Sequence, residues 1–245
     1  MTRIKVWDFP TRVFHWLLVV TFVVAFSIAQ FTSDEAPLFH VHALLGLIIG
    51  LIVVLRIIWG FVGSRYARFS SFVFSPKDLI GYVRDTFTGK GKRHIGHNPG
   101  SGYAIFAMLV LLGGIVATGL LSQTVKIFEE LHEFFVYAMI AVVTVHVLGV
   151  IWYTIRHKEN ITVSMVTGTK EGIQSEGILS ARPLAGFVFL FLTGFWAVSL
   201  FNGYDPNSGQ TTVPVFGTSI QLAESGDKAE KHEDKDKAHH KHDDD

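Results

Sequence analysis

The chain has 245 residues, 49% of them hydrophobic and only 17% charged, and its mean hydropathy is +0.37. This composition excludes an ordinary soluble domain of this length and predicts an integral membrane protein. The formal net charge of zero gives no sign of a nucleic-acid partner, and we expect none. The absence of cysteine excludes disulfides, iron–sulfur clusters and covalent c-type haem attachment, so any metal must be held by histidine or oxygen ligands.

The first two predicted spans are residues 13–31 and 41–62. Each is an apolar run of about the length that crosses a bilayer. A cleaved signal peptide is the alternative for the first run, with Ser27-Ile28-Ala29 as a poor cleavage site, but the apolar stretch is too long for the usual signal. His15 lies near the start of the first span and His42 near the start of the second.

Two further spans follow a basic loop at residues 63–102. The third span, residues 103–121, has no histidine and is rich in small residues, which let neighbouring backbones or a flat ligand come close. The fourth span, residues 131–155, carries His132 and His146. Their separation is just under four helical turns, about 21 Å, so both side chains leave the same helix face near opposite membrane surfaces.

Residues 173–201 are expected to form a linker and a fifth, shorter span, and residues 202–245 a polar tail. We expect the tail to be disordered, because it has few apolar residues to bury. Its end is rich in histidine and aspartate, namely His232, His239, His240, His242 and Asp243 to Asp245. Capture of a divalent metal ion by this tract is the minority alternative, and docking of a partner protein is equally open.

The distribution of lysine and arginine orients the chain, because basic residues in short loops stay on the cytoplasmic side. Basic residues gather at the N terminus, in the 63–102 loop and after Arg156, while the connector at Asp34 is acidic. We therefore expect a multi-pass protein of a bacterial inner membrane, surrounded by lipid. Its N terminus is then cytoplasmic and its C-terminal tail periplasmic.

In this orientation the four span histidines lie at two depths. His15 and His146 are near the cytoplasmic side, and His42 and His132 near the periplasmic side. A bis-imidazole pair across a helix bundle is how a b-type haem iron is held without cysteine or methionine. A lone membrane histidine is more often a hydrogen-bonded interior or interfacial residue, but agreement at four positions favours two haem b groups.

Three residues of the second span are candidates for contact with a haem. Gly46 and Gly50 follow His42 by four and eight residues and leave a slot on the same helix face, where a macrocycle could lie. A contact between helices through small residues is the alternative. Arg56 lies near the depth of the inner haem and is a candidate partner for a propionate, with snorkelling to the headgroups as the alternative.

The remaining histidines are not assigned as ligands. His40 is two residues before His42 and points away from it around the helix, so both cannot serve one iron. We interpret His40 as interfacial, with ligation in place of His42 as the alternative. His94, His97 and His157 lie in basic loops or at a helix end and are expected to be solvated.

With these residues in view, the sequence resembles the bacterial di-haem cytochrome b561 family and the b-type cytochrome subunits of nickel–iron hydrogenases. The resemblance covers about residues 3–172, so residues 1–172 are expected to form the di-haem membrane domain. The motifs that carry it are Trp7-Asp8, Thr11-Arg12-Val13-Phe14-His15-Trp16, His42-x-x-x-Gly46, Leu55-Arg56-Ile57-Ile58-Trp59-Gly60, Tyr66-Ala67-Arg68-Phe69, Leu131-His132-Glu133 and Val145-His146.

In that family four helices hold two b haems through histidines of helices one, two and four. The resemblance therefore implies a four-helix transmembrane bundle around two haems. With the fifth transmembrane helix, which is expected from its apolar run and lies outside the simplest family pattern, the expected fold class is an all-α integral membrane protein. The resemblance implies iron ligation by His15, His42, His132 and His146.

The resemblance also implies transfer of electrons between a membrane quinone and a partner, which is a hydrogenase, a c-type cytochrome or another redox subunit of a respiratory chain. Because the chain has no cysteine for other metal centres, we expect an electron-transfer subunit rather than a complete enzyme, and no catalytic side chain is assigned. Superoxide oxidation coupled to quinone reduction, an activity of relatives that it resembles, is one alternative. A divalent-metal transporter is another, although the spans lack the intramembrane carboxylates that a hard cation would favour.

Overall fold

The computed structural model describes residues 2–33, 36–122, 125–206, 208–215 and 217–222. Within these residues, five helices are long and apolar enough to cross a membrane. They are α1 (Phe9–Phe31), α2 (Phe39–Val62), α4 (Pro99–Leu121), α5 (Lys126–His157) and α7 (Pro183–Asn202). The predicted helical membrane protein with five spans is confirmed, and each helix ends within a few residues of its predicted span.

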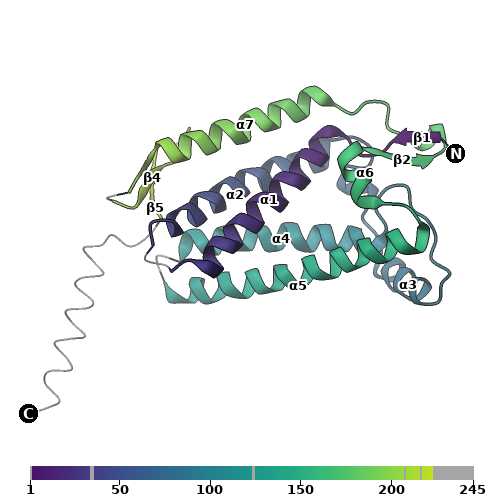
Figure 1. The fold of residues 1–245 in the computed structure, drawn as a ribbon, viewed down its shortest axis with the longest axis horizontal. Coiled ribbons are helices and arrows are strands. Elements are labelled where there is room, and N and C mark those ends of the chain that lie inside the picture. The colour runs from purple at the N-terminus through teal and green to yellow at the C-terminus, as the bar shows by residue number, and fades with distance from the viewer. Residues whose placement is uncertain (1, 34–35, 123–124, 207, 216, 223–245) are drawn as a thin grey trace, which may run out of the picture.

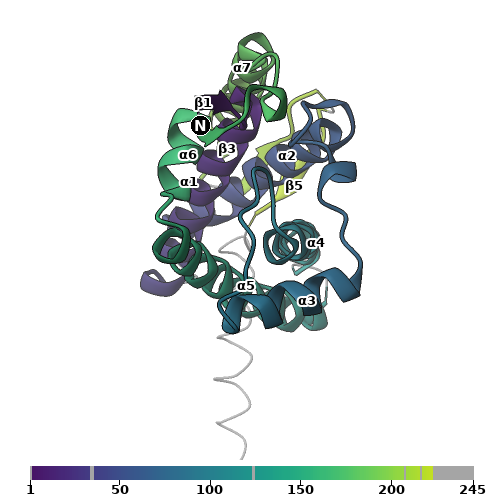
Figure 2. The same ribbon diagram turned by 90° about the vertical axis from the view of Figure 1, so that its right-hand side faces the viewer.

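Helices α1, α2, α4 and α5 run side by side along one axis, and α7 lies on the opposite side of the bundle from α5 (Figure 1). Packing pairs α4 with α5 and α1 with α2, while α2 also contacts α4, and α7 contacts both α1 and α2. In the end-on view α4 and α5 lie on one side of the bundle and α7 on the other (Figure 2). Helix α2 is therefore the central helix, and ten of its 24 residues are buried.

The helix starts follow ordinary capping rules. Asp8 caps α1 by accepting the backbone N–H of Thr11 at 2.9 Å, and Pro10 occupies the first turn. Asn98 and Ser101 form a reciprocal capping box at the start of α4. These polar residues satisfy backbone groups that the first turn of a helix leaves unpaired.

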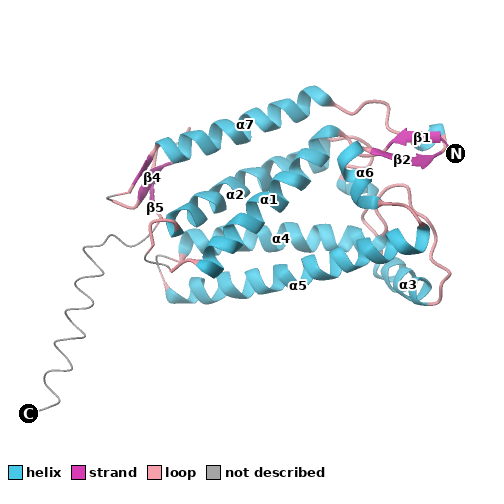
Figure 3. Cartoon of the chain, viewed as in Figure 1, coloured by secondary structure: helices cyan, strands magenta, loops and turns pink. Residues whose placement is uncertain are grey.

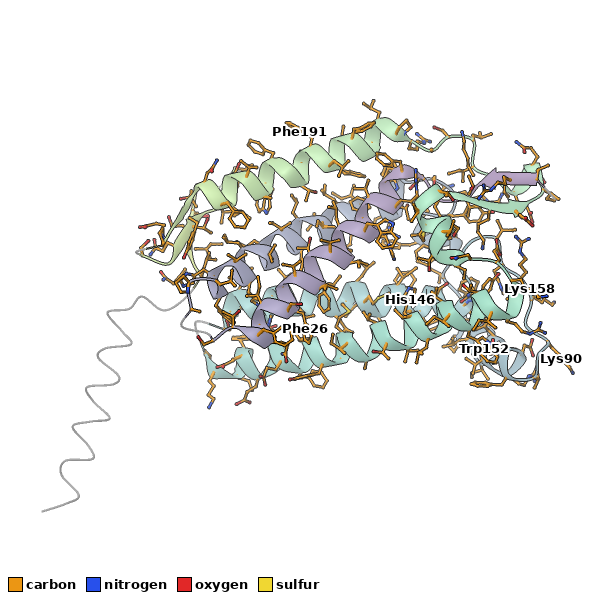
Figure 4. All side chains as sticks on the ribbon, in the orientation of Figure 1. Phe26, Lys90, His146, Trp152, Lys158 and Phe191 are labelled. Atoms are coloured by element: carbon orange, nitrogen blue, oxygen red, sulfur yellow. The ribbon has the colours of Figure 1, made fainter. Side chains whose placement is uncertain are left out.

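The bundle has apolar side chains both inside and outside. Phe14, Leu44 and Met139 are buried between helices, while Phe191 of α7 points away from the bundle (Figure 4). Every long helix exposes large apolar side chains along its outer face. An apolar surface of this extent is typical of a protein in contact with lipid.

One end of the bundle carries the basic loops, with Lys90 and Lys158 among their residues (Figure 4). There β1 (Thr2–Lys5) pairs antiparallel with β2 (Thr169–Gly172), so the N terminus is tied to the segment after α5 (Figure 3). The same end holds the short elements η1 (Phe69–Ser71), α3 (Pro76–Phe87), α6 (Ile161–Thr167) and η2 (Gln174–Glu176). We call it the basic end.

The segment after α7 differs from the disordered tail expected for residues 202–245. Strands β3 (Tyr204–Asp205), β4 (Gln210–Thr212) and β5 (Ser219–Gln221) form an antiparallel sheet. The segment folds because Leu222 and Ile220 pack into the core formed by α1, α2 and α7, and Thr211 donates to the Leu200 carbonyl at 2.8 Å. The histidine-rich stretch from residue 223 onward lies outside the described residues.

Candidate functional site

His42 and His132 face each other at the end of the bundle opposite the basic end. His42 comes from the first turns of α2 and His132 from the second turn of α5. Their ring centres are 6.1 Å apart and the ring planes are inclined by 80°. With metal–nitrogen bonds of about 2 Å, two imidazoles on opposite sides of one ion have ring centres roughly 6 Å apart. The spacing therefore fits a single metal ion between the two rings.

Both rings are held by backbone carbonyls. His42 Nδ1 lies 2.9 Å from the Ala25 carbonyl oxygen, and His132 Nδ1 lies 2.9 Å from the Ile115 carbonyl oxygen. A carbonyl oxygen only accepts hydrogen bonds, so each Nδ1 carries a proton, and in the neutral ring Nε2 is the nitrogen whose lone pair could bind a metal. Metal-binding histidines are commonly oriented in this way through the nitrogen that does not bind the metal.

The two glycines after His42 have different surroundings. A Cβ atom added to Gly46 would meet none of the described atoms within 4 Å, whereas one added to Gly50 would lie 3.2 Å from Val116 Cγ1 on α4. Gly46 thus opens space beside His42, as expected for a slot. Gly50 instead makes the close helix contact that was the alternative interpretation.

A further glycine, on α4, makes room for the His132 ring. A Cβ atom on Gly119 would lie 3.1 Å from the ring of His132, closer than most real Cβ contacts. The small residues of this span were expected to admit a close neighbour, but that neighbour was not identified from the sequence. It is the histidine itself, since Gly119 lets the ring reach the Ile115 carbonyl on the same helix.

The second pair lies toward the basic end. His15 of α1 and His146 of α5 are close enough to interact electrostatically, and His146 is labelled in Figure 4. His15 Nδ1 is buried and has no hydrogen-bond partner among the described residues, and its ring meets Trp16 edge-on at 4.9 Å. The structure thus brings the His42 and His132 rings into contact and places His15 and His146 near each other. That each pair binds one haem stays a prediction.

Arg56 is buried near the basic end, with 6% of its surface exposed. Its Nη2 donates to the Ala67 carbonyl at 3.3 Å, and its guanidinium lies 5.2 Å from the centre of the Phe69 ring. Nη1 is also buried and has no partner among the described residues. The loop after α2 thus covers Arg56, which argues against snorkelling to the headgroups, and the unpaired cationic donor suits an anionic group.

His97 was expected to be solvated, and this prediction is wrong. Its ring packs between Trp7 and Phe72, with centres 4.8 and 4.5 Å away, and its Nδ1 is buried without a partner in the described part of the chain. Burial lowers the pKa of His97 to about 3, with smaller effects from the positive charges of Arg56 and Lys170 and from His146. His97 therefore stays neutral at neutral pH and lies near the inner histidine pair.

Asp8 has a structural role that sequence reasoning missed. Its side chain, with 1% of the residue exposed, accepts hydrogen bonds from Thr11 N at 2.9 Å, Trp59 Nε1 at 3.1 Å and Ser64 N at 3.3 Å. These donors come from α1, α2 and the loop after α2. The carboxylate links the start of α1 to the end of α2 by hydrogen bonds, about two helical turns before His15 on α1.

The other histidines lie away from both pairs. His40 Nδ1 makes a hydrogen bond with the Tyr204 hydroxyl, so this ring faces the C-terminal sheet rather than His132. This geometry favours His42 over His40 as the residue that binds a metal together with His132. His94 and His157 are half-buried rather than fully solvated, because they pack on the rings of Tyr82 and Tyr153.

Comparison with known proteins adds independent evidence. The model of the family described as prokaryotic cytochrome b561 matches residues 6–168. The "Probable Ni/Fe-hydrogenase 1 B-type cytochrome subunit" of Escherichia coli K12 is 27% identical over 136 residues, 46% of this chain and 57% of the relative. Similarly named subunits of Bradyrhizobium diazoefficiens and Rhodobacter capsulatus are 21% and 20% identical, covering 69% and 68% of this chain and 86% and 81% of their own length.

The chain thus spans little more than half of the length of the E. coli relative. No solved structure is significantly similar to the chain. The family match nevertheless covers well over half of the 245 residues and contains both histidine pairs. The chain is therefore a multi-pass membrane cytochrome with b-type haem, and it belongs to the prokaryotic cytochrome b561 family.

Proposed function

We propose that this cytochrome binds two haem b groups and passes electrons between a membrane quinone and a separate redox protein. The observation that carries the proposal is the geometry of His42 and His132, whose ring centres are 6.1 Å apart and whose Nδ1 atoms are both bound to carbonyls. The ligands of the inner haem are His15 and His146. When bound, each haem supplies reversible one-electron transfer.

The chain's own part in this function is to position the two sites. Helix α5 contributes one histidine to each site, so a single rigid element sets their separation at about 21 Å. Gly46 leaves space beside His42, and Arg56 provides a buried positive charge for a propionate of the inner haem.

The positive charge of Arg56 favours the reduced state of the inner haem. Arg56→Gln should therefore lower the reduction potential of that haem by roughly 60 mV, equivalent to about 1.4 kcal/mol.

The partner is proposed from two observations. Relatives in three genera carry names of Ni/Fe-hydrogenase B-type cytochrome subunits. In addition, the chain has no cysteine with which to hold iron–sulfur clusters or hydrogenase metals. A hydrogenase or another metal-containing oxidoreductase is therefore the proposed partner, with a c-type cytochrome as the alternative.

The membrane orientation is proposed from the charges. Basic residues gather at one end of the bundle, which we assign to the cytoplasm of a bacterial cell. The pair His15 and His146 then lies near the cytoplasmic surface of the inner membrane. The pair His42 and His132 and the sheet formed by β3, β4 and β5 lie near the periplasmic surface.

The cofactor proposal is tested by spectroscopy of the purified protein. We expect the spectrum of a b-type cytochrome in the dithionite-reduced minus oxidised difference, and about two haems per chain when haem is quantified as its pyridine complex. A measured value of one haem per chain would show that one of the two proposed sites does not bind haem. No haem, after expression with ample haem supply, would overturn the proposal.

The quinone proposal needs a second experiment. A ubiquinol or menaquinol analogue, added without oxygen to the oxidised protein in nanodiscs, should reduce a large fraction of the haem that dithionite reduces. If neither quinol reduces haem in protein that dithionite reduces fully, the quinone proposal is wrong while the haem assignment stands.

A further inference from the structure

Helix α3 lies across the basic end of the bundle, roughly perpendicular to the long helices (Figure 2). Three contacts fix its depth. The Tyr82 ring packs against Gly100 in the first turn of α4, and the Tyr103 hydroxyl donates to the Phe74 carbonyl just before α3 at 3.2 Å. After α3, the Arg156 guanidinium donates to the Gly89 carbonyl. Helix α3 is thus held at the level where α4 begins and α5 ends.

One face of α3 is apolar and exposed. Ile80, Val83 and Phe87 follow one another at intervals of three and four residues, so they share a face, and they are 69%, 44% and 83% exposed. None of the twelve residues of α3 is buried by the described part of the chain. The helix begins with a complete capping box between Ser75 and Asp78, so it is well formed without a covered apolar face.

The charges on α3 are sorted by face. On a helix with 3.6 residues per turn, Lys77 and Arg84 lie together beside the apolar face, and Asp78 and Asp85 lie on the opposite side. Tyr82 lies on the remaining face of α3, which packs on α4. Apolar side chains flanked by cations are typical of a helix that lies in the surface of a membrane containing anionic lipids.

We propose that α3 is a membrane-surface anchor that binds anionic phospholipid at the basic end. Ile80, Val83 and Phe87 enter the boundary between headgroups and acyl chains, and Lys77 and Arg84 contact lipid phosphates. Twelve residues of helix extend only about 18 Å, too short to cross the bilayer, so the helix lies in the surface. Phe61 in the last turn of α2 and Val73 in the chain before α3 are also exposed apolar side chains. This interaction is independent of the electron-transfer function.

The absence of cysteine permits a direct test of depth. The haem-loaded, full-length variant Val83→Cys is labelled with a nitroxide and reconstituted in nanodiscs of phosphatidylcholine and phosphatidylglycerol. The matched control is Asp85→Cys, on the polar face of the same helix. We expect the Val83 label to be accessible to oxygen and protected from a water-soluble nickel chelate, and the Asp85 label to show the reverse. Equal access of the nickel chelate to both labels would overturn the proposal and leave the face open to a protein partner.

The lipid preference is tested with a fluorophore at Val83→Cys and quencher-labelled lipids. At equal mole fractions, labelled phosphatidylglycerol should quench the fluorescence at least about five times as strongly as labelled phosphatidylcholine. The reason is that each basic residue near an anionic surface adds to the attraction. The pair of substitutions Lys77→Gln and Arg84→Gln should bring the ratio close to one. Lys126→Gln, at the other end of the bundle, should leave it unchanged. A ratio near one in the unsubstituted helix would overturn the anionic preference.

Discussion

His42 and His132 come from different helices, yet their ring centres lie 6.1 Å apart with both Nδ1 atoms hydrogen-bonded to backbone carbonyls. Both rings are half-buried, and with Nδ1 donating to a carbonyl, Nε2 is the nitrogen of each ring that is left to bind a metal. In the proposed function, a haem iron would bind both Nε2 atoms.

Replacing either ring should remove the same haem. We expect His42→Ala and His132→Ala each to lower the haem content from about two to about one per chain, because a single imidazole and a small cavity hold a haem poorly. The double variant should lose no more than either single variant. Pyridine-complex assays on purified protein measure this directly.

His40→Ala is the matched control, since it removes an imidazole two residues away on the same helix. His40 faces Tyr204, so this variant should retain both haems. Loss of one haem from His40→Ala with retention in His42→Ala would reverse the ligand assignment. A further loss in the double variant would show that His42 and His132 serve different sites.

A larger side chain at Gly46 should reduce haem binding without disturbing the haem-free fold. A Cβ atom at this position meets none of the described atoms within 4 Å, so Gly46→Leu should leave the haem-free fold intact and block the slot beside His42. We expect about one haem per chain and an unchanged helix content by circular dichroism. Gly149→Leu is the control, because that glycine is exposed on α5 with equally open surroundings. Two haems in Gly46→Leu would show that the space beside His42 is not occupied by the macrocycle.

The bundle could be predicted from the sequence because its determinants are local. Each of the five spans is a continuous apolar run, and hydrocarbon imposes helical structure on such runs. The spacing of His132 and His146 placed them at two depths, because helical rise is nearly constant. The glycine slot was inferred in the same way, although only Gly46 proved open, because Gly50 meets Val116.

The features that could not be predicted depend on contacts between distant segments. His97 lies in a basic loop, and its burial arises from Trp7, ninety residues earlier, and from Phe72. The C-terminal sheet forms because Leu222 and Ile220 reach the core built by α1, α2 and α7. Asp8 could be recognised as a helix cap, but its bonds to Trp59 and Ser64 required the three-dimensional arrangement.

Asp8→Asn should destabilise the protein. An asparagine places an NH₂ group where the carboxylate now accepts, so at least one buried donor from Thr11, Trp59 or Ser64 loses its partner. A buried unpaired group of this kind costs about 1–3 kcal/mol, which should lower Tm in detergent by several degrees. Asp85→Asn removes a half-exposed carboxylate of α3 whose ion pair with Arg84 is a surface pair, so it should change Tm little. Equal Tm values for both variants would contradict the role assigned to Asp8.

His97 should make the stability of the protein depend on pH. Its pKa is lowered to about 3 by burial, with smaller effects from Arg56, Lys170 and His146, while the unfolded chain has the ordinary value of 6.5. Between these values the unfolded state binds a proton that the folded state does not. The free energy of unfolding therefore falls as pH falls from about 6.5 toward 3, by at most about 1.4 kcal/mol per pH unit.

The measurement is Tm at pH 7.5 and pH 5.5 for the unsubstituted protein and for His97→Gln. His94 also has a lowered pKa, chiefly through burial, and contributes to the same trend. The comparison with His97→Gln isolates the contribution of His97, because glutamine fills much of the space between Trp7 and Phe72 but does not titrate. We expect Tm to fall less between the two pH values in His97→Gln. If both proteins lose the same number of degrees, His97 is not held neutral by its surroundings, and the packing of its ring does not explain the acid sensitivity.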